Sequence, residues 1–124
     1  MGERVGIVLA SDDPERLYVA ATYVATELAM GKEVVIFAAG RSVLALAGRG
    51  GAGGPYYEKM RELKVDWHSL LKASKPLGLK IVACETALRI YEVSPDELDK
   101  ELVDAVSSMY TFLEEVGNGR VVAF

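Results

Sequence analysis

The apolar residues of this chain form short continuous runs separated by segments with helical periodicity. Four runs have the length of a strand, at residues 4–10, 33–39, 78–84 and 120–124. Continuous apolar runs are typical of strands that are buried on both faces, as strands of parallel sheets are. The pattern therefore predicts an α/β domain built on a mainly parallel sheet.

A strong signal for the start of a helix follows the first run. Residues 11–15, Ser-Asp-Asp-Pro-Glu, supply capping side chains, a proline for the first turn and an acid that favours the helix dipole. The helix is predicted to run from about Pro14 to Met30 and to end at Gly31. Its inward face is expected to carry Leu17, Ala21, Val24 and Leu28, broadened by Ala20 and Ala25. Strand, helix and strand then form a right-handed βαβ unit.

The later segments are also mostly helical in pattern. Helical spacing occurs at residues 43–47, 56–64, 67–75, 86–91 and 107–116. In the last of these, Tyr110 and Leu113 are expected to face inward, with Met109 as a further candidate. Residues 98–106 are either helical throughout or a helix followed by a short strand near 102–106, and periodicity does not decide between the two.

The composition narrows the possible domain organisation, partners and location of the protein. A chain of 124 residues suits a single domain, residues 1–124, and its 51% apolar content favours a surface for self-association. The net charge of −4 and the scattered basic residues argue against nucleic acid as a partner. The single cysteine excludes an intrachain disulfide, and the apolar runs are far shorter than the roughly 18 residues of a membrane span. With no signal-peptide pattern, a cytoplasmic protein is expected.

The candidate chemistry lies where the predicted strands end. Asp12, Arg41, Cys84 and Glu85 each follow or close a strand, and ligands of parallel sheets collect at the carboxyl ends of the strands. The dipole of the following helix would stabilise a thiolate at Cys84, and Arg41 would add to this effect. Asp12 and Glu85 would oppose it. Alternatively, Cys84 is a small buried hydrophobe with no chemical role.

Two other features suggest weaker hypotheses. His68, the single histidine, lies on the helix before the cysteine strand and is interpreted as a surface or interface residue, because a catalytic base must reach its proton. Residues 48–53 fit the G-x-G-x-x-G pattern of dinucleotide-binding loops, but no strand directly precedes them and no acid follows at the expected distance. The alternative is a mobile surface loop, or a loop ordered by a neighbouring subunit. Nothing in the sequence indicates a cofactor or a zinc site.

Taken from end to end, the chain resembles the DsrE/DsrF-like family, which includes proteins labelled predicted peroxiredoxins. The likeness is carried by the segments at residues 11–15, 30–37 (Met-Gly-Lys-Glu-Val-Val-Ile-Phe), 78–84 (Gly-Leu-Lys-Ile-Val-Ala-Cys), 94–98 and 120–124. Nearly the whole chain is covered. The glycine-rich loop has no counterpart in that pattern.

The resemblance implies a three-layer flavodoxin-like sandwich, with a mainly parallel sheet of about five strands, that assembles into trimers or hexamers. It also implies a sulfur-relay protein that carries sulfane sulfur as a persulfide on Cys84 and passes it from a donor protein to the thiol of an acceptor protein. Asp12, Arg41 and Glu85 would then be substrate-binding residues. Because there is no second cysteine, a self-contained peroxidase is not expected. The alternative is a non-catalytic oligomeric module that binds a small ligand or a partner.

Overall fold

Five parallel strands form one sheet in the order β4-β3-β2-β1-β5 in the computed structural model, which describes residues 3–124. The strands are β1 (Arg4–Leu9), β2 (Glu33–Ala38), β3 (Lys80–Cys84), β4 (Ala105–Ser107) and β5 (Arg120–Ala123). Leu9 pairs with Ala38, and Ala38 pairs with Ala83, so the carboxyl ends of the three central strands lie at one edge of the sheet. The predicted parallel sheet of about five strands is confirmed.

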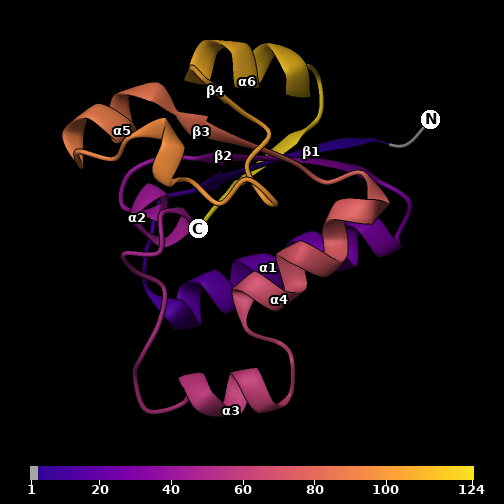
Figure 1. The fold of residues 1–124 in the computed structure, drawn as a ribbon. Coiled ribbons are helices and arrows are strands. Elements are labelled where there is room, and N and C mark those ends of the chain that lie inside the picture. The colour runs from indigo at the N-terminus through magenta and orange to yellow at the C-terminus, as the bar shows by residue number, and fades with distance from the viewer. Residues whose placement is uncertain (1–2) are drawn as a thin grey trace.

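Helices cover both faces of this sheet, giving the expected three layers (Figure 1). The helices are α1 (Pro14–Ala29), α2 (Ser42–Leu46), α3 (Tyr57–Glu62), α4 (Trp67–Ser74), α5 (Glu85–Ile90) and α6 (Met109–Val116), with 3₁₀ turns η1 (Lys75–Leu77) and η2 (Pro95–Glu97). α1 and α4 lie side by side on one face, and α6 lies on the other. The three-layer flavodoxin-like sandwich implied by the family resemblance is therefore the observed fold.

The first helix begins and ends as its sequence predicts. The Asp13 carboxylate accepts a hydrogen bond from the amide of Arg16 at 2.9 Å, and Pro14 follows the cap. Gly31, beyond the C-cap, has a φ of 85°, which glycine adopts without steric cost. The predicted inward face is buried at Leu17, Ala20, Ala21, Val24 and Leu28, whereas Ala25 is only half-buried.

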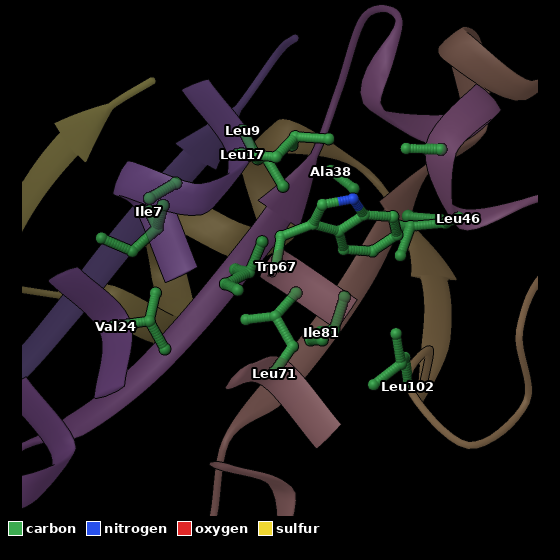
Figure 2. Close-up of a cluster of buried hydrophobic side chains, with 14 of the residues drawn as sticks. Ile7, Leu9, Leu17, Val24, Ala38, Leu46, Trp67, Leu71, Ile81 and Leu102 are labelled. Carbon is green, nitrogen blue, oxygen red and sulfur yellow. The ribbon is translucent and has the colours of Figure 1, made fainter. Parts of the chain in front are cut away.

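The larger core lies between the sheet and the α1–α4 layer, and Figure 2 shows part of it. Trp67, at the start of α4, is only 6% exposed and lies among side chains from strands, helices and the segment around Leu102. Asp66 caps α4 by accepting a hydrogen bond from the amide of Ser69, as the sequence suggested. The position of Trp67 fixes the start of α4 against the sheet.

The smaller core lies under α6 and corrects one expectation. It consists of Val35, Phe37, Val82, Phe112 and Val116. The prediction that Met109, Tyr110 and Leu113 face inward is wrong, since these side chains are 43%, 73% and 47% exposed.

The reason lies in the partner strand. Phe112 and Val116, one turn apart, occupy the space that the missing side chain of Gly6 leaves free on β1. Phe112 also stacks on Phe37, with ring centroids 5.3 Å apart. A residue far away in sequence thus selects which face of α6 is buried.

The ambiguous segment at residues 98–106 contains no α-helix. The capping box of Ser94 and Glu97 starts only the single 3₁₀ turn η2, after which Leu98 adopts extended backbone angles. Ala105–Ser107 then forms a strand that pairs with β3. Of the two alternatives, the one with a short strand is therefore confirmed for its strand, but the helix that it placed before the strand is wrong. α3 has no buried residue, and it stands away from the sheet in Figure 1.

Candidate functional site

Cys84 closes β3 and caps α5, so it lies at the carboxyl edge of the sheet. The preceding strand residues, Ile81, Val82 and Ala83, are buried, whereas Cys84 is partly exposed. Its Sγ accepts a hydrogen bond from the amide of Ala87 at 3.4 Å. The sulfur is therefore anchored at the amino-terminal end of α5, where amide dipoles point toward it. Cys84 also packs against both cores, so part of its surface has a structural role.

Asp12 and Arg41 meet beyond the ends of β1 and β2. The Nε and Nη2 atoms of Arg41 donate to the two carboxylate oxygens of Asp12 at 3.2 and 3.1 Å. These hydrogen bonds raise the pKa of Arg41 above its ordinary value, so the guanidinium stays charged at any physiological pH. The Arg41 side chain is 57% exposed, and its Cζ lies 5.9 Å from the centre of the Tyr91 ring. A charged group thus remains accessible at this edge.

Glu85, the first residue of α5, is exposed to solvent. Within residues 3–124, no hydrogen bond or ion pair joins Cys84 or Glu85 to the Asp12–Arg41 pair. The structure therefore places the four predicted site residues along one edge of the sheet and brings two of them into contact. Substrate binding by Asp12, Arg41 and Glu85 stays a prediction.

Sequence reasoning missed two residues of this edge. Ser107 pairs with Cys84 in the β3–β4 register, and α6 begins two residues later, so a second helix starts beside the cysteine. The strand Ala-Val-Ser is too short for periodicity to reveal, although the helix cap at Ser108 was a usable signal. Tyr91 lies near Arg41 because it is the C-cap of the short helix α5. No local sequence pattern predicts this contact.

The glycine-rich loop is held by its own chain. The amide groups of Gly48, Arg49 and Gly51 donate to the carbonyl oxygens of Ala45, Leu44 and Asp12. These three amides point into the protein and cannot cradle a phosphate, so the dinucleotide interpretation loses its physical basis. Gly51 is also buried against Trp67, so residues 48–51 pack on their own chain. The expectation of a mobile loop, or of one ordered by a neighbouring subunit, stays a prediction.

His68 lies in the first turn of α4, and its ring pairs with Asp99. No hydrogen bond connects it to Cys84 within residues 3–124. The side chain of His68 is 43% exposed, in agreement with its interpretation as a surface or interface residue.

Residues 3–124 offer neither a candidate metal site nor a candidate membrane-spanning helix. Residues 3–124 contain no group of three or more His, Cys, Asp or Glu side chains arranged to hold a metal ion. No helix in the same part of the chain combines the length and the apolar character that a bilayer crossing requires.

Comparison with known proteins gives a fold without an activity. No protein-family model matches the chain, and no curated protein sequence matches it significantly. Solved structures with a similar fold include the protein of unknown function MTH1491 from Methanobacterium thermoautotrophicum, with a TM-score of 0.66 and 20% identity over 98% of both chains. The conserved protein of unknown function BT1422 from Bacteroides thetaiotaomicron has a TM-score of 0.69 and 16% identity over 98% of this chain and 95% of its own. The ychN protein of E. coli has a TM-score of 0.66 and 17% identity over the whole of both chains. At these identities the similarity establishes the three-layer fold and nothing about the chemistry.

Proposed function

We propose that this protein is a DsrE/DsrF-like sulfur-relay protein that carries a sulfane sulfur atom on Cys84. The observation that carries the proposal is the position of the thiol, which is partly exposed at the end of a central strand and bonded to an amide of α5. The similarity in fold over nearly the whole chain supports the family assignment. A single cysteine suffices for this chemistry, because one nucleophile both accepts and releases the sulfur.

The transfer needs no oxidant. The Cys84 thiolate attacks the outer sulfur of a donor persulfide, R–S–SH; the new S–S bond forms as the old one breaks, and the donor leaves as R–S⁻. The product is Cys84–S–SH. An acceptor thiolate then attacks the outer sulfur, which regenerates the Cys84 thiolate and leaves the acceptor as a persulfide. The N–H groups of Arg41 that do not bond Asp12 could donate hydrogen bonds to an anionic donor molecule at this edge.

The test is mass spectrometry of the intact protein after incubation with inorganic polysulfide. The expected product is a protein heavier by one sulfur atom, which returns to the original mass when a small thiol is added. The Cys84→Ser variant should gain nothing. Because serine is nearly isosteric and can also cap α5, this variant should fold normally, and thermal unfolding checks that it does. An unmodified wild-type protein, under conditions that load a known persulfide carrier, would refute the proposal.

A second candidate function is a non-catalytic oligomeric module, and one observation favours it. The outer surface of α6 and the neighbouring edge strand expose several apolar side chains, namely Met109, Tyr110, Leu113 and Val121. Such a surface suits self-association into a trimer or hexamer, with Cys84 contributing only packing. Slow reaction of the folded protein with a thiol reagent would favour this function over sulfur transfer.

A further inference from the structure

The outer edge of β5 carries backbone groups that no other strand uses. β5 ends the sheet on its side, and its only neighbouring strand is β1. The amide of Phe124 donates to the carbonyl oxygen of Val8, and the carbonyl oxygen of Phe124 accepts from the amide of Ala10. Consecutive residues of a strand turn their backbone groups to opposite sides, so those of Val121 and Ala123 point away from β1. Within residues 3–124, these groups have no hydrogen-bond partner.

This edge lacks the features that usually protect an edge strand. Natural edge strands are short, or carry proline, a bulge or free charged side chains. β5 has the sequence Arg-Val-Val-Ala, and its register with β1 continues without a bulge from Arg120 to Ala123. The charge of Arg120 is bound by Glu27 of α1 and by Glu3. The strand at the opposite edge, β4, has only three residues. β5 is therefore the edge that is open to a further strand.

Two adjoining hollows lie on the flank of α1 beside this edge. Their volumes are about 370 and 340 Å³, and both are bordered by Val19, which is 50% exposed. Phe124 and the charged side chains at the start of α1 line the first hollow, whereas Tyr18 and Tyr23 line the second. The rings of Tyr23 and Phe124 lie 5.5 Å apart, so this flank of α1 follows β5. A strand added to β5 would turn every second side chain toward the hollows.

The side chains on β5 decide between two possible occupants, a second copy of this chain and a segment of a different protein. In a second copy, β5 would turn Val122 and Phe124 toward the α1 layer. Both side chains already pack against the larger core of their own chain, so they are not free to enter the hollows of a neighbour. A segment without a core of its own has free side chains. Its extended backbone would match the unpaired groups of the edge.

We propose that the edge of β5 binds an extended segment of another protein, which adds a strand to the sheet and places aliphatic side chains in the hollows beside α1. Hydrogen bonds to the backbone of Val121 and Ala123 hold the segment, and the hollows select side chains at alternate positions. The inference does not rest on the sulfur chemistry proposed for Cys84, because neither the edge nor the hollows contain that residue.

The probe is a capped, fluorescein-labelled peptide of about seven residues, in which leucine alternates with threonine and a lysine stands at each end. Its fluorescence anisotropy is recorded while the wild-type protein is added. Two further peptides are N-methylated, one at the leucines and one at the threonines. Alternate N–H groups of a strand point to opposite sides, so only one of these two peptides can still donate to β5. We expect that peptide and the unmodified one to bind saturably, and the other to bind at least about tenfold more weakly.

Variants of the protein locate the binding. Ala123→Pro removes an outward N–H group, and proline is tolerated on an edge strand where that group faces solvent. It should weaken binding of the unmodified peptide by about tenfold or more. Ala123→Val keeps the N–H group and is the matched control, which should bind normally. Val19→Glu places a charge between the two hollows and should also weaken binding, and it tests the site if the proline variant proves unstable on thermal unfolding.

Three results would overturn the inference. They are a lack of saturation up to about 1 mM protein, equal binding of the two N-methylated peptides, and an unchanged affinity in both Ala123→Pro and Val19→Glu. A fourth concerns the other occupant. If Ala123→Pro dissociated a wild-type oligomer in sedimentation velocity, a second copy of the chain would be the partner of this edge, and the proposal would be wrong.

Discussion

At the scale of single residues, Gly6 determines how closely a helix can approach the sheet. A Cβ atom at this position would lie 2.6 Å from Cγ2 of Val116 and 2.8 Å from Cζ of Phe112. Real Cβ atoms do not come this close to other atoms, so either α6 or these two side chains would have to move. The smaller core therefore depends on the absence of a side chain on β1.

Gly6→Ala is accordingly expected to destabilise the protein. Overpacking lowers the free energy of unfolding by about 1–3 kcal/mol. The smaller backbone freedom of alanine in the unfolded chain raises it by only about 0.4–1 kcal/mol. The free energy of unfolding, measured with urea, should fall by about 1–2 kcal/mol. Ala123→Val, which adds methyl groups at an exposed position of β5, is the matched control and should change the free energy little. Equal stability of Gly6→Ala and wild type would show that α6 has room to shift.

The same scale explains what could be predicted of the candidate site. Cys84, Asp12 and Arg41 could be located because each follows a buried apolar run, and runs of this kind end at one edge of a parallel sheet. The pairing of His68 with Asp99 could not be predicted, because the two residues are 31 positions apart and belong to segments that meet only in the folded chain.

At the scale of elements, an ion-pair cluster fastens the edge strand β5 to α1. Glu27 is only 5% exposed, yet it accepts a hydrogen bond from Arg120 and pairs with Lys32 at 3.3 Å. Burial raises the pKa of Glu27, but hydrogen bonds from Tyr23, Lys32 and Arg120 lower it more, so the net pKa lies below the ordinary value. The carboxylate is thus favoured in the folded state despite its burial.

This cluster predicts a dependence of stability on pH. Because the pKa of Glu27 is lower in the folded state, its contribution is fully present above the unfolded pKa and is lost as the pH falls through the folded pKa. Glu27→Gln should lower the free energy of unfolding at pH 7 by about 1–3 kcal/mol and flatten its decrease in acid. Urea titrations at a series of pH values measure both effects.

Glu33→Gln is the control, because it makes the same change in an exposed ion pair with Arg4. It should alter the free energy of unfolding by less than about 1 kcal/mol. A pH profile of Glu27→Gln that is parallel to that of the wild type would contradict the role assigned to the cluster.

Elements differed in how well their sequences specified them. α1 has a cap, a proline, a wide apolar face and a terminal glycine that all agree, and its prediction is confirmed. α6 has apolar residues on more than one face, so its own sequence permits several orientations, and only the gap at Gly6 decides among them. The helix predicted within residues 98–106 does not form, because the capping signal before it starts only the 3₁₀ turn η2 and the chain is extended from Leu98.

At the scale of the whole molecule, the two faces of the sheet are covered unequally. α1 and α4 bury one face, whereas the eight residues of α6 are the main cover of the other. The side chains of Tyr110 and Leu113 remain exposed there, and so does Val121 of β5, whose register partner Gly6 faces α6. We name these three residues and Met109 the α6 surface, and we expect it to be where subunits meet.

The expected outcome is that the purified protein is a trimer or hexamer by sedimentation velocity. Leu113→Glu places a charge in the α6 surface and should shift the protein to monomers, since an unpaired charge is costly to bury. Val19→Glu makes the same change on α1, where Val19 is 50% exposed, and should leave the assembly intact. A wild-type monomer at high concentration, or dissociation by the α1 variant alone, would contradict the assignment.

The position of the last strand has a consequence for how the protein is made. β5 pairs with β1, in a register that sets Val5 against Arg120, so the first and last strands of the described chain are neighbours. While a ribosome is still synthesising the middle of the chain, β1 can pair with β2 on one side only. Its other edge stays open until residues 120–123 emerge, and long-range pairing of this kind is slow. The nascent protein therefore passes through a stage in which a central strand is exposed as an edge, and this is the stage at which chaperones would most effectively protect it.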